Sequence, residues 1–161
     1  MNEIECTFCK IQKTEDIIWK GKHFFIIFDN VPVNPGHTLI IPLKHKISLL
    51  DLSKSEWSEL YNSIREAHKI INNTDLEKLY TDMLTKSSSI KNSDKFIGDA
   101  LKNLRNTHEI KGFNYGVNEG IAAGRTVHHL HWHVIPRYEG DVEDPVGGVR
   151  SVIPGRANYK I

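Results

Sequence analysis

Three short apolar runs near the start of the chain predict neighbouring strands. Residues 17–20 and 23–28 flank a short turn that contains Gly21, which is typical of a β-hairpin. A turn rich in Pro and Gly at 32–36 precedes the third run, 37–41. Because short links join these strands, an antiparallel sheet is favoured over a parallel one.

The middle of the chain changes to helical periodicity. A Ser-x-x-Glu capping box at 53–56 opens an amphipathic pattern that predicts a helix over roughly 53–71. A second capping box at 74–77 and an apolar pattern over 94–104 predict two more helices. We interpret 72–111 as packing or partner surface, since it contains no chemical motif.

The last third of the chain returns to strand patterns. Residues 113–118 read as one strand, and 127–135 are rich in β-branched and apolar residues and end at a proline, as strands often do. A loop containing glycines, 119–126, joins them. From 138 to 161 glycines and prolines predict an irregular tail. The length of the chain predicts a single domain, 1–161.

Composition and charge narrow the class of protein. A chain of 161 residues can bury a genuine core, and its 39% hydrophobic and 25% charged content are ordinary for a globular domain. The net charge of +1 gives no global electrostatic reason to bind nucleic acid or a membrane surface. The acidic start of the sequence lacks the apolar region of a signal peptide, so we expect a cytoplasmic protein.

The densest chemical signal is a row of three histidines, His129, His131 and His133. On a strand, alternate side chains face the same way about 6.5–7 Å apart, so the imidazoles would line one face while Leu130 and Trp132 pack behind. Three imidazoles can bind a metal, as in catalytic zinc sites. Alternatively, the middle one can be a nucleophile whose neighbours bind charged oxygens. The row alone leaves both open.

A second candidate is the C-x-x-C pair of Cys6 and Cys9. Two buried thiols, half of a zinc site and a redox pair are three interpretations. The redox interpretation requires a surrounding βαβ unit, which the following segment does not supply. A zinc site needs two more ligands, for which His45 and the histidine row are available. The pair alone leaves open whether a metal is bound.

The motifs that carry a family resemblance are the run from His129 to Tyr138, Asn118-Glu119-Gly120, Gly124-Arg125-Thr126-Val127, Pro35-Gly36-His37-Thr38 and Gly147-Gly148-Val149-Arg150. Together they resemble the histidine triad family of nucleotide hydrolases and transferases, and most of all its microbial diadenosine-polyphosphate-hydrolase-like members. The resemblance covers about residues 6–71 and 113–155. The region 72–111 looks longer than is usual in the family, so we interpret it as a helical insert. It implies an α+β fold with a five-stranded antiparallel sheet and packed helices, commonly dimerised into a continuous sheet.

The resemblance also implies a reaction, cleavage of a nucleoside monophosphate from its α-phosphate linkage. The position of the nucleophile is His131, which would form a nucleotidyl-histidine intermediate that water then hydrolyses. Its other nitrogen must be held by an acceptor, typically a backbone carbonyl. His129 and His133 flank it, His133 contacting phosphate oxygens, and Asn118 is the polar contact near the leaving-group oxygen.

Further positions match the residues with which the family holds its nucleotide. These are Phe8, Ile11, Ile27, Asp29, Asn118, Gly124, Arg125, Thr126 and His133. A carboxylate at Asp29 suits two ribose hydroxyls, and the donors around Gly124 can stabilise developing phosphate charge. Arg125 stands where the family usually has Gln, and as a longer, charged side chain it could clamp a phosphate.

Some members of the family carry a structural zinc site, whose ligands would match Cys6, Cys9, His45 and His129 here. In that case His129 is not a free acid and supports His131 instead. The resemblance thus implies structural zinc, no organic cofactor, an adenine dinucleotide or nucleotide conjugate as substrate, and a homodimer.

Three functions remain as hypotheses. The main one is a hydrolase of dinucleoside polyphosphates or of related conjugates such as nucleoside phosphoramidates. The second is a nucleotide-binding adaptor with vestigial catalysis, whose insert docks a partner; the intact histidine row argues against it. The third is a metallohydrolase in which the row binds a catalytic metal, although the row contains no carboxylate.

Overall fold

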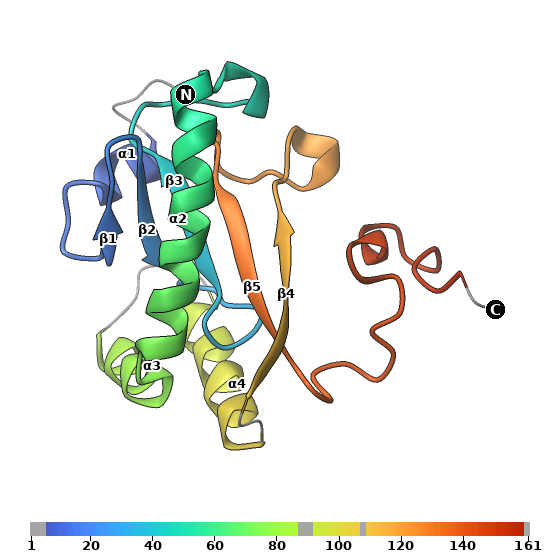
Figure 1. Cartoon of the computed structure of the whole chain (residues 1–161). Helices are drawn as coiled ribbons and strands as arrows, with labels where there is room; N and C mark the ends of the chain where they lie inside the picture. Colours follow the sequence, from blue (N-terminus) through green and yellow to red (C-terminus); the bar gives the residue numbers. More distant parts are fainter. Residues whose placement is uncertain (1–5, 87–91, 107–108, 160–161) are drawn as a thin grey trace.

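A five-stranded antiparallel sheet with the strand order β1-β2-β3-β5-β4 forms the centre of the computed structural model (Figure 1). The structure describes residues 6–86, 92–106 and 109–159; the first five residues, for which no signal peptide was expected, lie outside them. The strands are β1 (Trp19–Lys20), β2 (Phe24–Phe28), β3 (Thr38–Pro42), β4 (Ile110–Gly116) and β5 (Trp132–Tyr138). The helices are α1 (Thr7–Ile11), α2 (Lys54–Asn73), α3 (Leu76–Thr85) and α4 (Ser93–Asn106). The predicted α+β class and five-stranded antiparallel sheet are confirmed.

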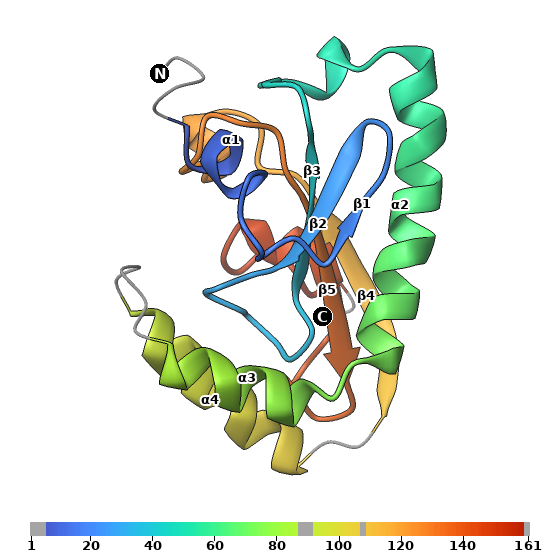
Figure 2. The same ribbon diagram turned by 90° about the vertical axis from the view of Figure 1, so that its left-hand side faces the viewer.

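The sheet has an apolar layer on each face, because every residue of β2 is buried. Phe24 and Ile26 point into the larger core, which α2 covers. Phe25 and Ile27 point to the other face, into a smaller core closed by α1. Figure 2 shows the sheet between α2 and α1. Two-sided burial explains why β2 reads as a continuous apolar run rather than as an alternating one.

Helix α2 begins where its capping box places it. The Ser53 side chain accepts from the backbone of Glu56, and the Glu56 carboxylate accepts from the backbone of Ser53. Its buried stripe includes Leu60, Ala67 and Ile71. The second capping box was wrong, because Asp75 rather than Thr74 caps α3, accepting from the Lys78 amide. Thr74 instead ends α2 and donates to the Ile70 carbonyl.

Helices α3 and α4 pack against each other at one end of the sheet, as Figure 2 shows. Tyr80 of α3 and Ile97 and Ala100 of α4 extend the larger core over that end. The two helices fall within the predicted insert 72–111. Among the described residues, no helix combines the length and the apolar character needed to cross a membrane.

The strand predicted over 127–135 begins later, at Trp132. Before it the backbone is irregular: the Leu130 amide donates to the Lys46 carbonyl at 2.6 Å, outside the sheet ladder. The prediction of three equally spaced imidazoles on one strand was therefore wrong. His133 lies on the strand opposite Leu39, whereas His129 and His131 lie on the approach to it.

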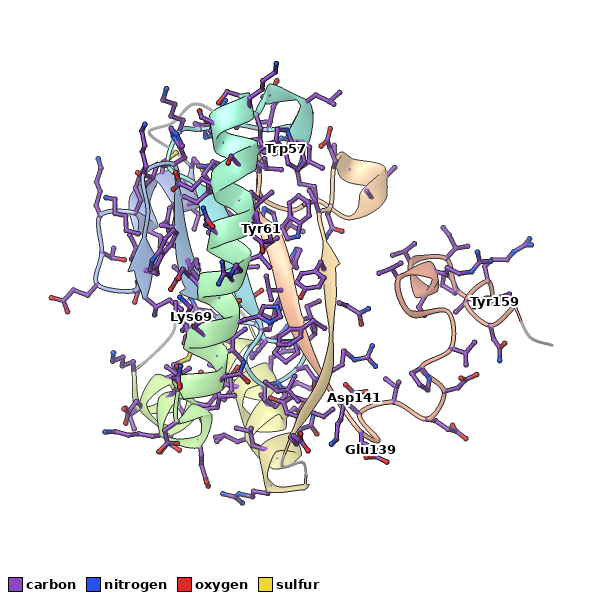
Figure 3. The ribbon with its side chains drawn as sticks, viewed as in Figure 1. Trp57, Tyr61, Lys69, Glu139, Asp141 and Tyr159 are labelled. Carbon is purple, nitrogen blue, oxygen red and sulfur yellow. The ribbon has the colours of Figure 1, made fainter. Side chains whose placement is uncertain are left out.

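The tail leaves β5 through a tight turn closed by Arg137 and Asp141. The guanidinium donates two hydrogen bonds to the carboxylate, at 2.7 and 2.8 Å. Figure 3 shows Glu139 and Asp141 at this turn and Tyr159 far along the tail. Beyond the turn the tail is irregular apart from one short 3-10 helix, Gly148–Val152.

Candidate active site

His131 is held in one tautomer by the backbone. Its Nδ1 lies 2.8 Å from the carbonyl oxygen of His129, so Nδ1 carries the proton and donates it. Only 6% of the residue is exposed. Its Nε2 is thus left with the lone pair that a nucleophile needs. This is the carbonyl contact that the sequence analysis required.

Aromatic rings enclose His131 on two sides. Phe8 of α1 packs edge-on, with ring centroids 5.2 Å apart, and His133 lies at 5.0 Å. Phe8, Ile27 and Ile11 all belong to the smaller core. The structure therefore brings together the three residues predicted to line a base pocket, beside the predicted nucleophile.

His129 turns its side chain away from His131 and toward the two cysteines. Its Nδ1 lies 3.4 Å from Cys6 Sγ and 3.6 Å from Cys9 Sγ, and His45 Nδ1 lies 3.4 Å from Cys9 Sγ. The Nε2 of His129 donates to the Pro42 carbonyl at 2.9 Å, so Nδ1 is the nitrogen with the lone pair. Burial lowers the pKa of His129 to about 4, which keeps it neutral.

These four side chains fit a tetrahedral zinc site. Their ligand atoms all lie within 4.8 Å of one another. Zn–S and Zn–N bonds of about 2.3 and 2.0–2.1 Å place neighbouring ligands roughly 3.5 Å apart, which agrees with the three separations between these histidines and cysteines. The Pro42 carbonyl supplies the second hydrogen bond that commonly orients a zinc-bound imidazole. All four positions are protein ligands, so a metal here would be structural rather than catalytic.

A second histidine pair lies on the other side of His131. His37 Nε2 is 2.9 Å from His133 Nδ1, and Asp29 Oδ2 is 3.4 Å from His37 Nδ1. Burial lowers the pKa of His133 to about 3, helped by the neighbouring His37 and His131. Burial also lowers the pKa of His37, although Asp29 opposes this. With both imidazoles neutral, one ring donates its N–H to the lone pair of the other across this hydrogen bond.

One ring nitrogen of His133 lacks a hydrogen-bond partner in the described part of the protein. Its Nε2 is buried and has no hydrogen bond among the described residues. A buried nitrogen without a partner is costly unless it serves a ligand. The position of His133 beside His131 suits it to a phosphate oxygen.

His37 was not among the site residues predicted from the sequence. One feature could have indicated it. His37 lies just before β3 and two residues before Leu39, so the two side chains face the same way, and Leu39 pairs with His133. Asp29, which was predicted to hold a ribose, contacts His37 and also accepts from the Val31 amide at 2.8 Å. The predicted ribose acceptor and the histidine pair thus share one cluster.

The loop before the histidine row lies at the same end of the sheet as α1 (Figure 1). Arg125 donates from Nη1 to the Ile47 carbonyl at 2.8 Å. Asn118, Gly124 and Thr126 make no hydrogen bond to the three histidines within the described ranges. Gly124 ends a 3-10 turn in the left-handed region, at φ 88°.

Comparison with known proteins identifies the family. The model of the HIT domain family matches residues 10–140, most of the chain. The chain belongs to the HIT domain family. A HIT protein of Bacillus anthracis has a solved structure that superposes with a TM-score of 0.53 at 28% identity, over 85% of this chain and 76% of that one.

Several curated relatives of this HIT protein are named as enzymes, and two of them illustrate the match. The AP-4-A phosphorylase of Mycobacterium tuberculosis is 29% identical over 86% of this chain and 55% of its own length. The asymmetrical bis(5'-nucleosyl)-tetraphosphatase of Schizosaccharomyces pombe is 27% identical over 85% of this chain and 57% of its own length. The HIT protein thus spans a little over half of either enzyme.

Proposed function

We propose that this HIT protein is a nucleotide hydrolase that cleaves the α-phosphate linkage of dinucleoside polyphosphates, with His131 as its nucleophile. The carrying observation is the 2.8 Å bond from His131 Nδ1 to the His129 carbonyl. In the neutral ring it places the lone pair on Nε2, and it stabilises the positive charge that the ring gains when it attacks. The named activities of the two enzyme relatives support the substrate class.

The chemistry needs two displacements. The Nε2 lone pair of His131 attacks the α-phosphorus, the bond to the leaving polyphosphate oxygen breaks, and that oxygen leaves with its electron pair. Water then attacks the same phosphorus, the N–P bond breaks, and the nucleoside monophosphate is released with the imidazole regenerated. The proposed roles of His133 and Asp29 are to contact a phosphate oxygen and the ribose; Phe8, Ile11 and Ile27 line the base pocket.

We predict further polar contacts to the α-phosphate from the loop that precedes the histidine row. Asn118 would lie near the leaving oxygen, and the donors near Gly124 and Thr126 would face the phosphate once substrate is bound. Arg125 would join them through the N–H groups that its bond to the Ile47 carbonyl leaves available. The leaving group could equally be an amine, as in a nucleoside phosphoramidate.

A catalytic metal bound by the three histidines of the row is less well supported than the nucleophilic mechanism. His129 groups with the cysteines and His133 groups with Asp29 and His37, while His131 belongs to neither potential metal cluster of the described chain. The three imidazoles do not converge on one point. We propose structural zinc at Cys6, Cys9, His45 and His129 instead. The homodimer implied by the family resemblance stays a prediction that sedimentation would test.

The test is turnover by His131→Ala. Wild type and variant are mixed briefly with diadenosine tetraphosphate or adenosine phosphoramidate, and intact-protein mass spectrometry and released AMP are recorded. We expect an adenylyl adduct or AMP release from wild type only, with nucleotide binding retained by the variant. His68→Ala is the control, because His68 stacks on Phe113 on the opposite face of the sheet. Equal turnover by His131→Ala would refute the mechanism, and binding without turnover in wild type would favour the adaptor.

A further inference from the structure

The segment 29–37, here called the Asp29–His37 loop, carries two groups of the proposed site. The Asp29 amide donates to the His37 carbonyl at 2.9 Å, so the loop closes on itself and brings both side chains together. Helices α3 and α4 reach this loop at two buried points. These contacts link the insert, which contains no chemical motif, to the site.

The first contact is made by Tyr80 of α3. Its hydroxyl accepts from the Gly36 amide at 2.7 Å, and none of the residue is exposed. Gly36 directly precedes His37 and has a φ of 79°. Without the hydroxyl, a buried N–H would have no acceptor, and the turn would move to satisfy it. Burial raises the pKa of Tyr80, so the phenol stays neutral and can accept.

The second contact is made by Ser93, the first residue of α4. Its hydroxyl donates to the Asn30 carbonyl at 2.6 Å, and 1% of the residue is exposed. Asn30 directly follows Asp29. The two contacts therefore fall on the residues next to the two site groups, one at each end of the loop.

The sheet holds the middle of the loop by separate bonds. Asn34 donates to the Pro136 carbonyl at 3.0 Å, and the Tyr138 hydroxyl donates to the Pro35 carbonyl at 3.2 Å. Neither bond reaches Asn30 or Gly36. The helical hairpin thus supplies the polar partners that the sheet leaves unmet at the two ends of the loop.

We propose that the α3–α4 hairpin is a brace for the site, in which Tyr80 positions His37 and Ser93 positions Asp29. The inference rests on the proposed function, because it gives Asp29 and His37 their tasks. Tyr80 and Ser93 are positioning residues that touch no substrate. Since His37 bonds to His133 and Asp29 is assigned to the ribose, the two contacts have different kinetic consequences.

The experiment removes each hydroxyl alone. In Tyr80→Phe we expect kcat to fall about 10- to 100-fold with KM nearly unchanged, the order of loss that follows a small misplacement of a catalytic group. In Ser93→Ala we expect KM to rise several-fold with a smaller effect on kcat. Tyr61→Phe is the matched control, because Tyr61 is 65% exposed on α2 and lies on its outer side in Figure 3. An equal loss in the control, or unchanged kinetics in both test variants, would overturn the brace.

A double-mutant cycle separates positioning from general destabilisation. If Tyr80 acts through His37, adding Tyr80→Phe to His37→Ala lowers kcat no further, whereas additive losses would contradict the proposal. Hydrogen exchange of the amides at 29–37 gives a readout independent of turnover. If wild type itself shows no turnover, the proposed function fails and exchange alone decides the brace. Faster exchange confined to this loop in Tyr80→Phe supports it, and unchanged or uniformly faster exchange refutes it.

Discussion

Gly36→Ala should be among the most damaging single-methyl changes in this protein. Gly36 has a φ of 79°, a left-handed conformation that costs an L-residue about 1–2 kcal/mol. A Cβ there would also lie 2.9 Å from Ile71 Cγ2 and 3.1 Å from Pro136 Cγ, both on packed elements. Overpacking of this kind costs about 1–3 kcal/mol. Together we expect a loss of about 2–5 kcal/mol in the free energy of unfolding.

Two other glycines separate these two costs. Gly140 has nearly the same φ, 78°, but a Cβ there would meet nothing within 4 Å, so Gly140→Ala should lose only about 1–2 kcal/mol. Gly98 lies inside α4 with open space around it, and Gly98→Ala should gain about 0.5–1 kcal/mol. The same methyl group thus has three expected effects, of which one has the opposite sign.

The assay is urea unfolding of wild type and the three variants at equal protein concentration and metal content. Gly36→Ala should show the lowest midpoint at an unchanged m value, with a fall of about 5–15 °C in unfolding temperature. The reasoning would be refuted if Gly36→Ala and Gly140→Ala lost the same free energy. In that case contact with Ile71 and Pro136 would add nothing to backbone strain.

Two further predictions concern the metal and the tail. Purified protein should hold about one zinc per chain by elemental analysis, and Cys9→Ser should lose it and unfold about 5–10 °C lower; wild type that stays metal-free after dialysis against zinc would contradict this. Hydrogen bonds from Arg137 lower the pKa of Asp141, so this carboxylate stabilises the fold above its unfolded pKa and less as pH falls through its folded pKa. Asp141→Asn should therefore cost about 1–3 kcal/mol at neutral pH, and progressively less as the pH falls through the lowered folded pKa of Asp141; a pH-independent difference would exclude ionisation of Asp141 as the source.

Much of the fold could be read from periodicity, because burial imposes it. The start of α2 was predictable from Ser53 and Glu56, whose spacing lets each side chain satisfy the other's amide. The start of α3 was not, because Thr74 and Asp75 are both competent caps and tertiary packing chooses between them. Local chemistry gives helix ends only where one residue is clearly favoured.

The sequence indicated which residues group together in the candidate site better than it indicated how they are arranged. The carbonyl that holds His131 and the grouping of the cysteines with His45 and His129 agree with the sequence-based expectation. The prediction that all three histidines lie on one straight strand was wrong, because the Leu130 amide donates to the Lys46 carbonyl rather than to a neighbouring strand. His37 was missed because its partner His133 is nearly a hundred residues away, and single-sequence periodicity carries no information about such contacts.

His129 contributes its side chain to the cysteine cluster and its backbone carbonyl to the nucleophile. Its imidazole lies among the cysteines, while its carbonyl fixes the proton of His131. Every amino acid has that carbonyl, so only the first duty constrains which side chain can stand at this position. During divergence the side chain at 129 should therefore vary together with Cys6, Cys9 and His45, and independently of the nucleophile. A loss of activity on replacing His129 would measure the integrity of the support beneath His131, and would be misread as the loss of a reacting group.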